Sequence, residues 1–316
     1  MSGYELHLGG KPVDTAALRL YSHFGFADSE LPLLDRFVDP QARGEPGFVT
    51  EPFGVRTRVA NLWPEIAPFD GALWGLPVPG NWHWDASEWL AIARSVLQAQ
   101  GRYRVMELGA GWGPACVGGA VMARFHGLGD IAITAVEADP HHFGFLRQHL
   151  LDNGFDPDAH LLMEAAVGVR DGHTRFPEFE GDATTYGARP LDADGDYLGR
   201  PAVRTRRVRL VSFRRLLRRE PVWDLVHIDV QGGEMDICRS ARRELSARVA
   251  RVCLGTHSRK LDGDLYDLFW RRGWVLENEK PTRMEWKPGA KSQEAMNVHD
   301  GLQVWRNPAL RPGPAG

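Results

Sequence analysis

Cysteine, net charge and long apolar runs are all scarce in this sequence of 316 residues. Its three cysteines, Cys116, Cys238 and Cys253, are an odd number and lie far apart, a pattern that indicates neither a disulfide framework nor a zinc cluster. The net charge of −3 argues against a general nucleic-acid or membrane-surface binder. No segment approaches the roughly 18 apolar residues of a membrane span, and the first residues lack the pattern of a signal peptide. We therefore expect a globular, cytoplasmic protein without membrane association.

The residues that are present can form a substantial core, since 43% are hydrophobic and 10% aromatic. Residues 1–100 are expected to form a small, irregular N-terminal layer on the substrate side, because prolines, glycines and short aromatic clusters punctuate them. This layer ends in a helix over residues 85–101, which Asp85 and Glu88 begin as a capping box. We expect the ligand-binding domain at residues 101–310 and a short tail at residues 311–316.

The second part of the chain alternates apolar strands with helices. Strands are predicted at 104–108, 131–138, 161–168, 224–230 and 251–257, helices at 114–125, 141–154, 234–245 and 264–273, and a terminal antiparallel hairpin at 274–280 and 302–307. Such alternation predicts an α/β fold in which a parallel sheet is covered by helices on both faces. Ligands of these sheets bind beyond the carboxyl ends of the strands, so the residues that follow each strand are the candidates for function.

The first strand ends in Glu107-Leu-Gly109-Ala-Gly111. Alternating glycines allow a tight turn and close approach of a ligand, although a purely structural turn explains them equally well. The third glycine of the dinucleotide fingerprint is replaced by Pro114, which lacks the N–H that a pyrophosphate requires. Glu107 would repel a phosphate, so the pattern favours a ligand that carries positive charge.

The second strand ends in Glu137-Ala-Asp139-Pro140. A carboxylate at this strand tip is well placed to accept hydrogen bonds from a ribose diol. Asp139 followed by Pro140 is also a good helix start, so Asp139 is expected to cap the helix and Glu137 to contact the ligand. S-adenosylmethionine has a ribose but no phosphate, so it needs a ribose contact without a phosphate-binding device. Its sulfonium is cationic, so nearby carboxylates are favourable.

Two further strand tips carry polar side chains that we expect to converge. The fourth strand ends in Asp229-Val-Gln231-Gly-Gly-Glu234, and the fifth is followed by His257. These residues could act on a ligand, but Asp229, Gln231 and Glu234 could also cap the following helix. The glycines after Asp229 permit close approach of a transferred group.

Four segments of the chain resemble the FkbM-type methyltransferases, a branch of the S-adenosylmethionine-dependent enzymes with a Rossmann-like class I sheet. They are ELGAGWG at 107–113, VEADP at 136–140, EAAVG at 164–168 and DLVHIDVQGGEMDICRSA at 224–241. The sequence departs from the family pattern at Gln231, where a glutamate is usual. The resemblance implies O-methylation of a hydroxyl on a sugar or secondary metabolite.

The resemblance also implies roles for single residues. Glu107, Gly109, Ala110, Gly111 and Trp112 would line the methionine portion of the cofactor. Glu137 would hold the ribose and Ala138 would lie beside the adenine. Glu164 is a candidate for the adenine side, and Asp229 would lie near the sulfonium and the acceptor.

Methyl transfer to a hydroxyl needs an aligned acceptor and help in removing its proton. We predict that His257 or Asp229 accepts this proton while the other orients it. A divalent metal held by Asp229, Glu234 and His257 is the less favoured alternative. Two other classes stay open, a nicotinamide-dependent oxidoreductase and a non-catalytic binding protein with a methyltransferase-like fold.

The acceptor is expected to be a small molecule or a glycan. Candidate acceptor contacts are Trp82, His83, Thr185, Tyr186 and Gln231. The arginine-rich segment Arg200–Arg219 could bind phosphate, but an edge strand and an amphipathic helix with Val211, Phe213, Leu216 and Leu217 turned inward explain it better. We therefore do not expect a nucleic-acid substrate.

Overall fold

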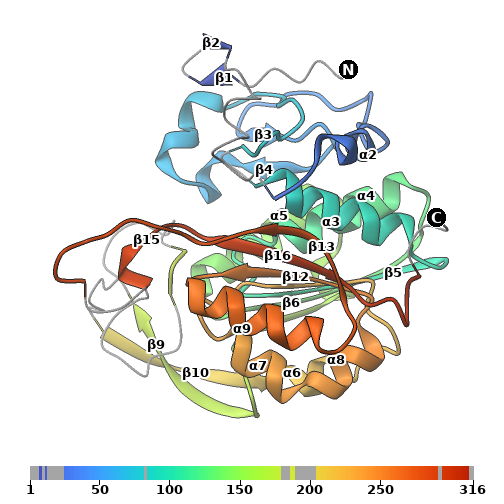
Figure 1. Ribbon diagram of the computed structural model, residues 1–316. Coiled ribbons are helices and arrows are strands. Elements are labelled where there is room, and N and C mark those ends of the chain that lie inside the picture. The colour runs from blue at the N-terminus through green and yellow to red at the C-terminus, as the bar shows by residue number, and fades with distance from the viewer. Residues whose placement is uncertain are drawn as a thin grey trace.

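A seven-stranded sheet forms the centre of the molecule (Figure 1). The computed structural model describes residues 25–81, 84–178, 186–188, 204–290 and 294–312, together with two short strands, β1 (His7–Leu8) and β2 (Lys11–Pro12). The central strands follow the order β7–β6–β5–β11–β12–β16–β13. They are β5 (Arg102–Leu108), β6 (Asp130–Glu137), β7 (Leu161–Glu164), β11 (Leu225–Ile228), β12 (Arg251–Thr256), β13 (Val275–Lys280) and β16 (Gly301–Arg306).

Strand direction confirms the predicted sheet. Strands β5, β6, β7, β11 and β12 run parallel, whereas β16 lies antiparallel to both β12 and β13. The predicted α/β fold with a terminal antiparallel hairpin is therefore correct. From β5 the chain first builds outward through β6 and β7 and then returns to place β11 on the other side of β5. The strand order reverses there, and the adjacent strand tips are where such sheets bind ligands.

Helices cover both faces of this sheet (Figure 1). One face carries α3 (Ala86–Leu97), α4 (Pro114–Phe125) and α5 (Pro140–Asp152), and the other carries α6 (Phe213–Leu217), α7 (Glu234–Ser240), α8 (Arg242–Arg248) and α9 (Arg259–Trp270). The single helix predicted over 234–245 is wrong, because the chain turns at Ala241 between α7 and α8. This turn lets Ile237, Ala241 and Leu245 all pack into the core on that face.

Local capping signals explain where two of these helices begin. The side chain of Asp139 accepts hydrogen bonds from the backbone N–H groups of His141 and His142, with Pro140 at the first helical position of α5. At α3, the Glu88 side chain accepts from the backbone N–H of Asp85 at 3.0 Å, as in a capping box. Both predicted caps are confirmed.

The N-terminal layer packs on α3 and α5. It contains α2 (Pro32–Asp35), β3 (Phe48–Thr50), β4 (Arg56–Arg58) and three short 3-10 helices at Asp28–Glu30, Val59–Asn61 and Pro64–Phe69. The rings of Phe53 and Trp89 lie 4.8 Å apart, and Arg58 donates two hydrogen bonds to Asp152 at 2.7 and 2.8 Å. Phe53 and Trp89 share one buried cluster with Tyr103 of β5. The layer therefore has a core in common with the sheet, and the domain boundaries at residues 100 and 310 stay predictions.

Three strands form a separate small sheet beside the central one. Strand β10 (Arg204–Ser212) lies parallel to β8 (Ala166–Gly168) and antiparallel to β9 (Gly172–Glu178). The single strand predicted over 161–168 is wrong, because β7 and β8 belong to different sheets. The chain changes direction at Ala165, whose N–H donates to the carbonyl of Glu137 at 2.8 Å. Figure 1 shows β9 and β10 extending away from the central sheet.

In its described part, the arginine-rich segment Arg200–Arg219 forms a strand and an amphipathic helix, as the sequence predicted. Strand β10 leads directly into α6, and Val211, Phe213, Leu216 and Leu217 are buried as expected. Most of the arginine side chains of this segment lie at the surface.

Between β13 and β16 the chain runs outward as an arm. The arm contains β14 (Arg283–Met284), a 3-10 helix at Glu294–Met296 and β15 (Asn297–His299), and β14 pairs antiparallel with β15. Its return brings residues 299–301 to the carboxyl end of β12.

The three cysteines are buried and unbonded. None of the helices in the described part of the chain combines the length and the apolarity that crossing a bilayer requires.

Candidate active site

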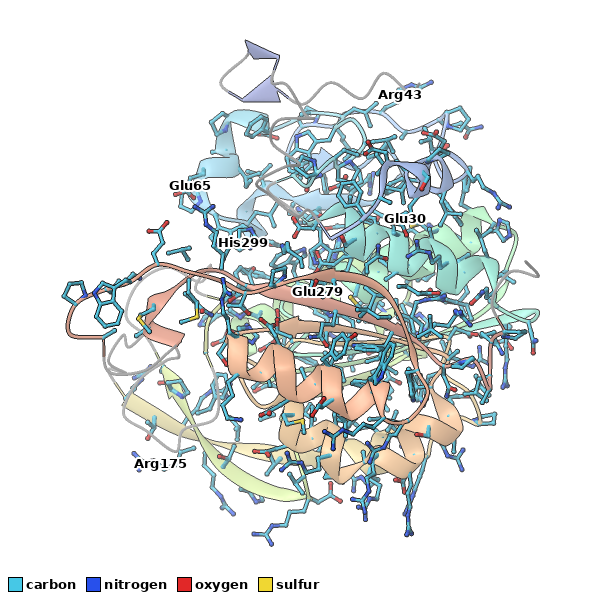
Figure 2. All side chains as sticks on the ribbon, in the orientation of Figure 1. Glu30, Arg43, Glu65, Arg175, Glu279 and His299 are labelled. Atoms are coloured by element: carbon cyan, nitrogen blue, oxygen red, sulfur yellow. The ribbon has the colours of Figure 1, made fainter. Side chains whose placement is uncertain are left out.

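A cavity of about 900 Å³ opens at the carboxyl ends of β5, β6 and β11. Its wall combines these strand tips with residues of the N-terminal layer, such as Trp63, and with the end of the arm at His299 and Asp300. Figure 2 shows Glu65 of the N-terminal layer and His299 of the arm on the same side of the molecule, and both line this cavity. Segments that are remote in the sequence therefore close one chamber at the point where the strand order reverses.

The glycine turn after β5 is required by close packing of two strand tips. Gly109 has φ +72°, a left-handed conformation that L side chains rarely adopt. A Cβ at this position would lie 1.8 Å from the carbonyl oxygen of Asp229. The tips of β5 and β11 therefore touch through backbone alone, and this contact forms the floor of the cavity together with Ala110 and Gly111.

Glu107 lies at the inner end of this turn with its carboxylate buried. It accepts hydrogen bonds from the backbone N–H groups of Ala115 at 3.1 Å and Cys116 at 2.8 Å, at the start of α4. Its other neighbour is His227 of β11, whose Nδ1 lies 3.5 Å from a Glu107 oxygen. Burial raises the pKa of Glu107, while His227 and the two N–H groups oppose this rise. Glu107 thus lines the cavity and contacts both the start of α4 and His227.

Glu137 is held by two backbone donors at the tip of β6. One carboxylate oxygen accepts from Gly111 N–H and the other from Asp139 N–H, each at 2.7 Å. Burial raises the pKa of Glu137, and the nearby His142 lowers it. Each carboxylate oxygen can accept more than one hydrogen bond, so both can still accept from hydroxyl groups of a ligand. Ala138 lies beside it in the same wall.

Tyr186 covers the glycine turn. Its ring stacks on His142 at 4.2 Å between centroids and meets the Trp112 ring edge-on at 4.7 Å. Its hydroxyl donates to the carbonyl of Asn61 in the N-terminal layer at 2.5 Å. The structure therefore puts Tyr186 on the side of Glu137 and Gly111, and its approach to the acceptor stays a prediction.

Glu164 does not reach the cavity. It ends β7 in an exposed position, 3.4 Å from Nη1 of Arg206, whereas the next residues, Ala165 and Ala166, do line the cavity. Its expected contact with the adenine side therefore has no support from the lining of this cavity. Arg206 also donates to the carbonyl of Ala138, so the small sheet is tied to the tip of β6. Trp82, His83 and Thr185 lie outside the described residues.

Asp229 and Gln231 follow β11 and line the cavity together. Gln231 donates from Nε2 to Asp229 Oδ1 at 2.7 Å, and it has a left-handed φ of 57° that is uncommon for a residue with a side chain. Although burial opposes it, contact with His257 holds the pKa of Asp229 below its usual value. Asp229 is thus a fixed carboxylate, and an amide at position 231 donates to it where a glutamate would repel it.

His257 stands behind Asp229 and is almost completely buried. Its Nε2 lies 3.2 Å from Asp229 and its Nδ1 lies 3.4 Å from Glu234. Burial favours the neutral ring, but the two carboxylates outweigh it and raise the pKa of His257 well above the usual value. A histidine that already holds its proton, and that does not line the cavity, is a poor proton acceptor. Of the two expected arrangements, this geometry favours the one in which His257 orients Asp229.

The donor atoms of the predicted metal alternative do converge. Asp229, Glu234 and His257 each offer an atom within 4.8 Å of the others. However, Glu234 already accepts from the N–H groups of Val230 at 2.9 Å and Gly232 at 3.0 and 3.1 Å. The imidazole between the two carboxylates holds a proton rather than offering a lone pair. These contacts within the chain compete with a metal for the same donor atoms, and the metal stays the less favoured alternative.

Several residues of the cavity were missed by the sequence reasoning. His227 lies between Glu107 and Glu88, with Nε2 3.8 Å from Glu88, and the Trp84 ring lies 5.3 Å from it. Burial raises the pKa of Glu88. A signal for His227 existed, because positions 227 and 229 point to the same face of one strand. No local signal could place Glu88 or Asp300, which come from α3 and from the arm.

Negative charge dominates the wall. Eight carboxylates line the cavity: Glu65, Asp85, Glu88, Glu107, Glu137, Asp139, Asp229 and Asp300. Among the described residues, Lys280 is the one lysine or arginine in the lining, and it is ion-paired with Asp85. Such a wall attracts a cation and repels phosphate.

A comparison with known proteins identifies the family of this chain. No protein-family model matches it. A curated protein of Jannaschia sp. (strain CCS1), named "Putative methyltransferase", is 33% identical over 276 residues, which cover 85% of this chain and 95% of that protein. The chain belongs to the S-adenosylmethionine-dependent methyltransferases. This assignment sets aside both the nicotinamide-dependent oxidoreductase and the non-catalytic binding protein.

Solved structures of methyltransferases are also similar to this one at a low level. Precorrin-6y C5,15-methyltransferase of Geobacter metallireducens GS-15 is 14% identical, with 71% of this chain and 88% of that chain covered and a TM-score of 0.39. Methyltransferase FkbM of Methylobacillus flagellatus KT is 12% identical, with 64% and 44% covered and a TM-score of 0.38. Membership of the FkbM-type branch stays a prediction.

The cavity fits the cofactor of this methyltransferase family. A Cβ at Gly111 would lie 3.3 Å from the Tyr186 ring, so this narrow cradle needs a glycine next to Glu137. Buried carboxylates suit a sulfonium and a ribose, and the proline at position 114 begins α4 without offering an N–H to a phosphate.

Proposed function

We propose that this methyltransferase transfers the methyl group of S-adenosylmethionine to a hydroxyl oxygen of a neutral sugar or secondary metabolite. The wall of the cavity carries this proposal, because its carboxylates far outnumber its cations. Carboxylates accept hydrogen bonds from the hydroxyls of a neutral acceptor and repel an acceptor that bears phosphate. Aromatic rings such as Trp84 add flat apolar surfaces on which a sugar or a phenolic ring can pack.

The two ends of the cavity would hold the two substrates. Glu107, Gly109 and Gly111 would border the methionine portion of the cofactor, Glu137 would accept from the ribose hydroxyls, and Ala138 would lie beside the adenine. When bound, the cofactor supplies an electrophilic methyl group on a cationic sulfur. The carboxylate of Asp229 lines the same cavity and would lie near the sulfonium, which its negative charge favours.

Positioning by the chain accounts for much of the expected rate. His257 and Gln231 hold Asp229 through contacts of 3.2 and 2.7 Å, so this carboxylate can receive a hydrogen bond without first reorganising. Orienting the acceptor oxygen in line with the methyl carbon can lower the barrier by several kcal/mol, up to about 7–11 in model systems. The proposal uses these residues without a metal, and a divalent ion held by Asp229, Glu234 and His257 stays the less favoured alternative.

The partners follow from the same charge pattern. We expect a small-molecule or glycan acceptor in the cytoplasm, and we expect nucleic acid to be a poor substrate. Phosphodiesters that approached the cavity would meet its carboxylates, and several arginines of β10 and α6 pair with acidic neighbours, as Arg215 does with Asp171 at 3.2 Å.

The test combines the full chain with S-adenosylmethionine labelled in its methyl group and a panel of acceptors. The panel contains neutral sugars, glycosylated and phenolic metabolites, their phosphorylated counterparts and random RNA, each also as the methyl ether of the hydroxyl under test. We expect label in the neutral hydroxyl compounds, no label in the blocked ethers, and a methyl ether in the product by ¹³C NMR. Label on nitrogen or carbon, or label confined to the phosphorylated compounds or to RNA with steep salt dependence, would contradict the proposal.

A further inference from the structure

The antiparallel pairing of β12 with β16 brings an acidic residue from the arm to the site. Thr256 pairs with Gly301, so the preceding residue of the arm, Asp300, comes opposite His257. A Cβ at Gly301 would lie 2.3 Å from Thr256 Oγ1 and 2.6 Å from the backbone nitrogen of Thr282. Only glycine allows this close approach, and as a result Asp300 lines the same cavity as Asp229.

Two carboxylates therefore flank one imidazolium from the cavity side. His257 Nε2 lies 3.2 Å from Asp229 Oδ1 and 4.0 Å from Asp300 Oδ2, and Glu234 contacts the other ring nitrogen. The nearer carboxylate is bound to the histidine and to Gln231. The more distant one, Asp300, has a side chain that is 42% exposed, close to the 36% of Asp229, so the two differ in their distance to the histidine rather than in exposure. The two carboxylates are thus not equivalent.

We propose that Asp300 accepts the proton of the acceptor hydroxyl, whereas Asp229 stays ionised and holds a fixed negative charge beside the cofactor. This inference rests on the proposed O-methylation. It replaces His257 and Asp229, the two proton acceptors expected from the sequence, with a residue of the arm that lines the cavity. It also gives each of the two carboxylates one role.

The groups around the two carboxylates support this division. Four charged or titratable groups face Asp300: His257 after β12, Asp229 after β11, His299 on β15 and Lys280 on β13. Burial and the neighbouring Asp229 raise the pKa of Asp300, and His257 opposes this rise. The pKa of Asp229 is displaced in the opposite direction by His257. Environments that separate the pKa values of two adjacent carboxylates are a mark of distinct acid–base roles.

The step balances in atoms and charge. The acceptor oxygen forms its bond to the methyl carbon as the bond from carbon to sulfur breaks, and the electron pair of that bond stays on sulfur. The hydroxyl proton moves to an oxygen of Asp300, so one carboxylate and one sulfonium become neutral together. Because the Asp300 side chain is partly exposed, the proton can then pass to water.

The first experiment compares Asp300→Asn with the wild-type chain. Its acceptor is a hydroxyl compound that the wild type methylates in the acceptor panel described above. We expect the single-turnover rate to fall by about 100-fold or more, because a positioned base contributes about 10²–10⁴-fold. The affinity for S-adenosylmethionine, measured by calorimetry, should stay within about twofold. The wild-type rate should rise with pH as Asp300 ionises, and this rise should be absent in the variant.

Two further variants make the result specific. Asp236→Asn changes an exposed aspartate of α7 that does not line the cavity, and should leave rate and pH profile unchanged. Asp229→Asn should weaken cofactor binding and retain the pH-dependent rise. The proposal is overturned if Asp300→Asn keeps the wild-type rate and pH profile, or if Asp229→Asn is the variant that loses the rise.

A measurement without an acceptor separates this inference from the proposed function. In protein labelled with ¹³C at aspartate carboxyls, the signals that disappear in Asp300→Asn and Asp229→Asn identify the two residues. We expect the Asp300 signal to titrate at a higher pH than the Asp229 signal, and the reverse order would contradict the assignment. A product methylated on nitrogen or carbon would count against O-methylation itself, whereas an O-methylated product with an unaffected Asp300→Asn variant would count against Asp300 alone.

Discussion

The two ends of the cavity are held in different ways. At the proposed cofactor end, Glu107 and Glu137 are fixed by backbone N–H groups in the βα turns or in the first turn of α4: those of Ala115, Cys116, Gly111 and Asp139. At the acceptor end, Asp229 is fixed by side chains of Gln231 and His257, and Asp300 arrives from a remote arm. Backbone donors stay in place when side chains change. The comparison indicates that the cofactor end resists substitution and that the acceptor end is where specificity can vary.

The largest expected effect comes from Gly109, where the tips of β5 and β11 touch. Gly109→Ala would drive a Cβ to 1.8 Å from the Asp229 carbonyl. We expect a loss of about 3 kcal/mol of unfolding free energy, which combines left-handed strain with overpacking, together with weak cofactor binding. Urea unfolding measures the loss of stability, and calorimetry measures cofactor binding.

Gly101→Ala is the matched control for this change. Gly101 has φ +73°, but a Cβ there would meet nothing within 4 Å. We expect it to cost only about 1–2 kcal/mol from the left-handed conformation. Equal losses at the two positions would mean that contact between the two strand tips contributes nothing.

An intermediate effect is expected from Glu137→Gln at the cofactor end. The amide NH₂ would face one of two backbone N–H donors, at Gly111 or Asp139, and could not accept from both. We expect the dissociation constant for S-adenosylmethionine to rise about 10–100-fold, which is about 1.4–2.7 kcal/mol, with the fold retained. Calorimetry and circular dichroism check this.

Glu164→Gln provides the comparison for Glu137→Gln, because Glu164 is exposed and outside the cavity. It should bind the cofactor as the wild type does. A similar loss of affinity in both variants would restore Glu164 as a cofactor contact and would place the adenine differently.

The smallest effect concerns the pH dependence of stability at the acceptor end. Burial lowers the pKa of His257, but Glu234 and Asp229 outweigh burial and raise this pKa above its ordinary value. Above about pH 6.5, the folded chain therefore keeps a proton on His257 that the unfolded chain has released. Stability should therefore fall as the pH rises from there to the pKa of the folded state, by at most about 1.4 kcal/mol per pH unit.

His257→Gln should flatten this slope in urea unfolding measured from pH 6 upward. His173→Gln, an exposed change on β9, should leave the slope as it is. An unaltered slope in His257→Gln would show that this histidine is neutral in the folded chain, and the cluster would then need another account.

Much of the fold was predictable because its signals are local. The capping residues Asp85 and Asp139 began helices as expected, and apolar runs predicted every parallel strand of the central sheet. The strand over 161–168 and the helix over 234–245 failed for one reason: both contain a buried alanine, Ala165 or Ala241, at which the chain turns to satisfy packing beyond the local segment. Alanine carries no signal of such a turn.

The site residues also fall into those that local sequence predicted and those whose place depends on remote contacts. The residues at the cofactor end other than Glu164 reach the cavity as expected, because a strand tip and the turn after it are adjacent in sequence. His257 was correctly expected to meet Asp229, but its role changed once Glu234 was seen on its other side. The place of Tyr186 beside Gly111 could not be predicted, since it depends on a hydrogen bond to Asn61, 125 residues away.

Composition, strand periodicity and the residues after each strand determined by themselves that this chain is an α/β enzyme suited to a cationic nucleoside, since those properties depend on neighbouring residues. Only the tertiary structure decided which carboxylates share one histidine, which end Tyr186 covers and how the arm brings Asp300 opposite His257. The physical reason is that protonation depends on distances of 3–4 Å between groups that packing, rather than chain proximity, brings together.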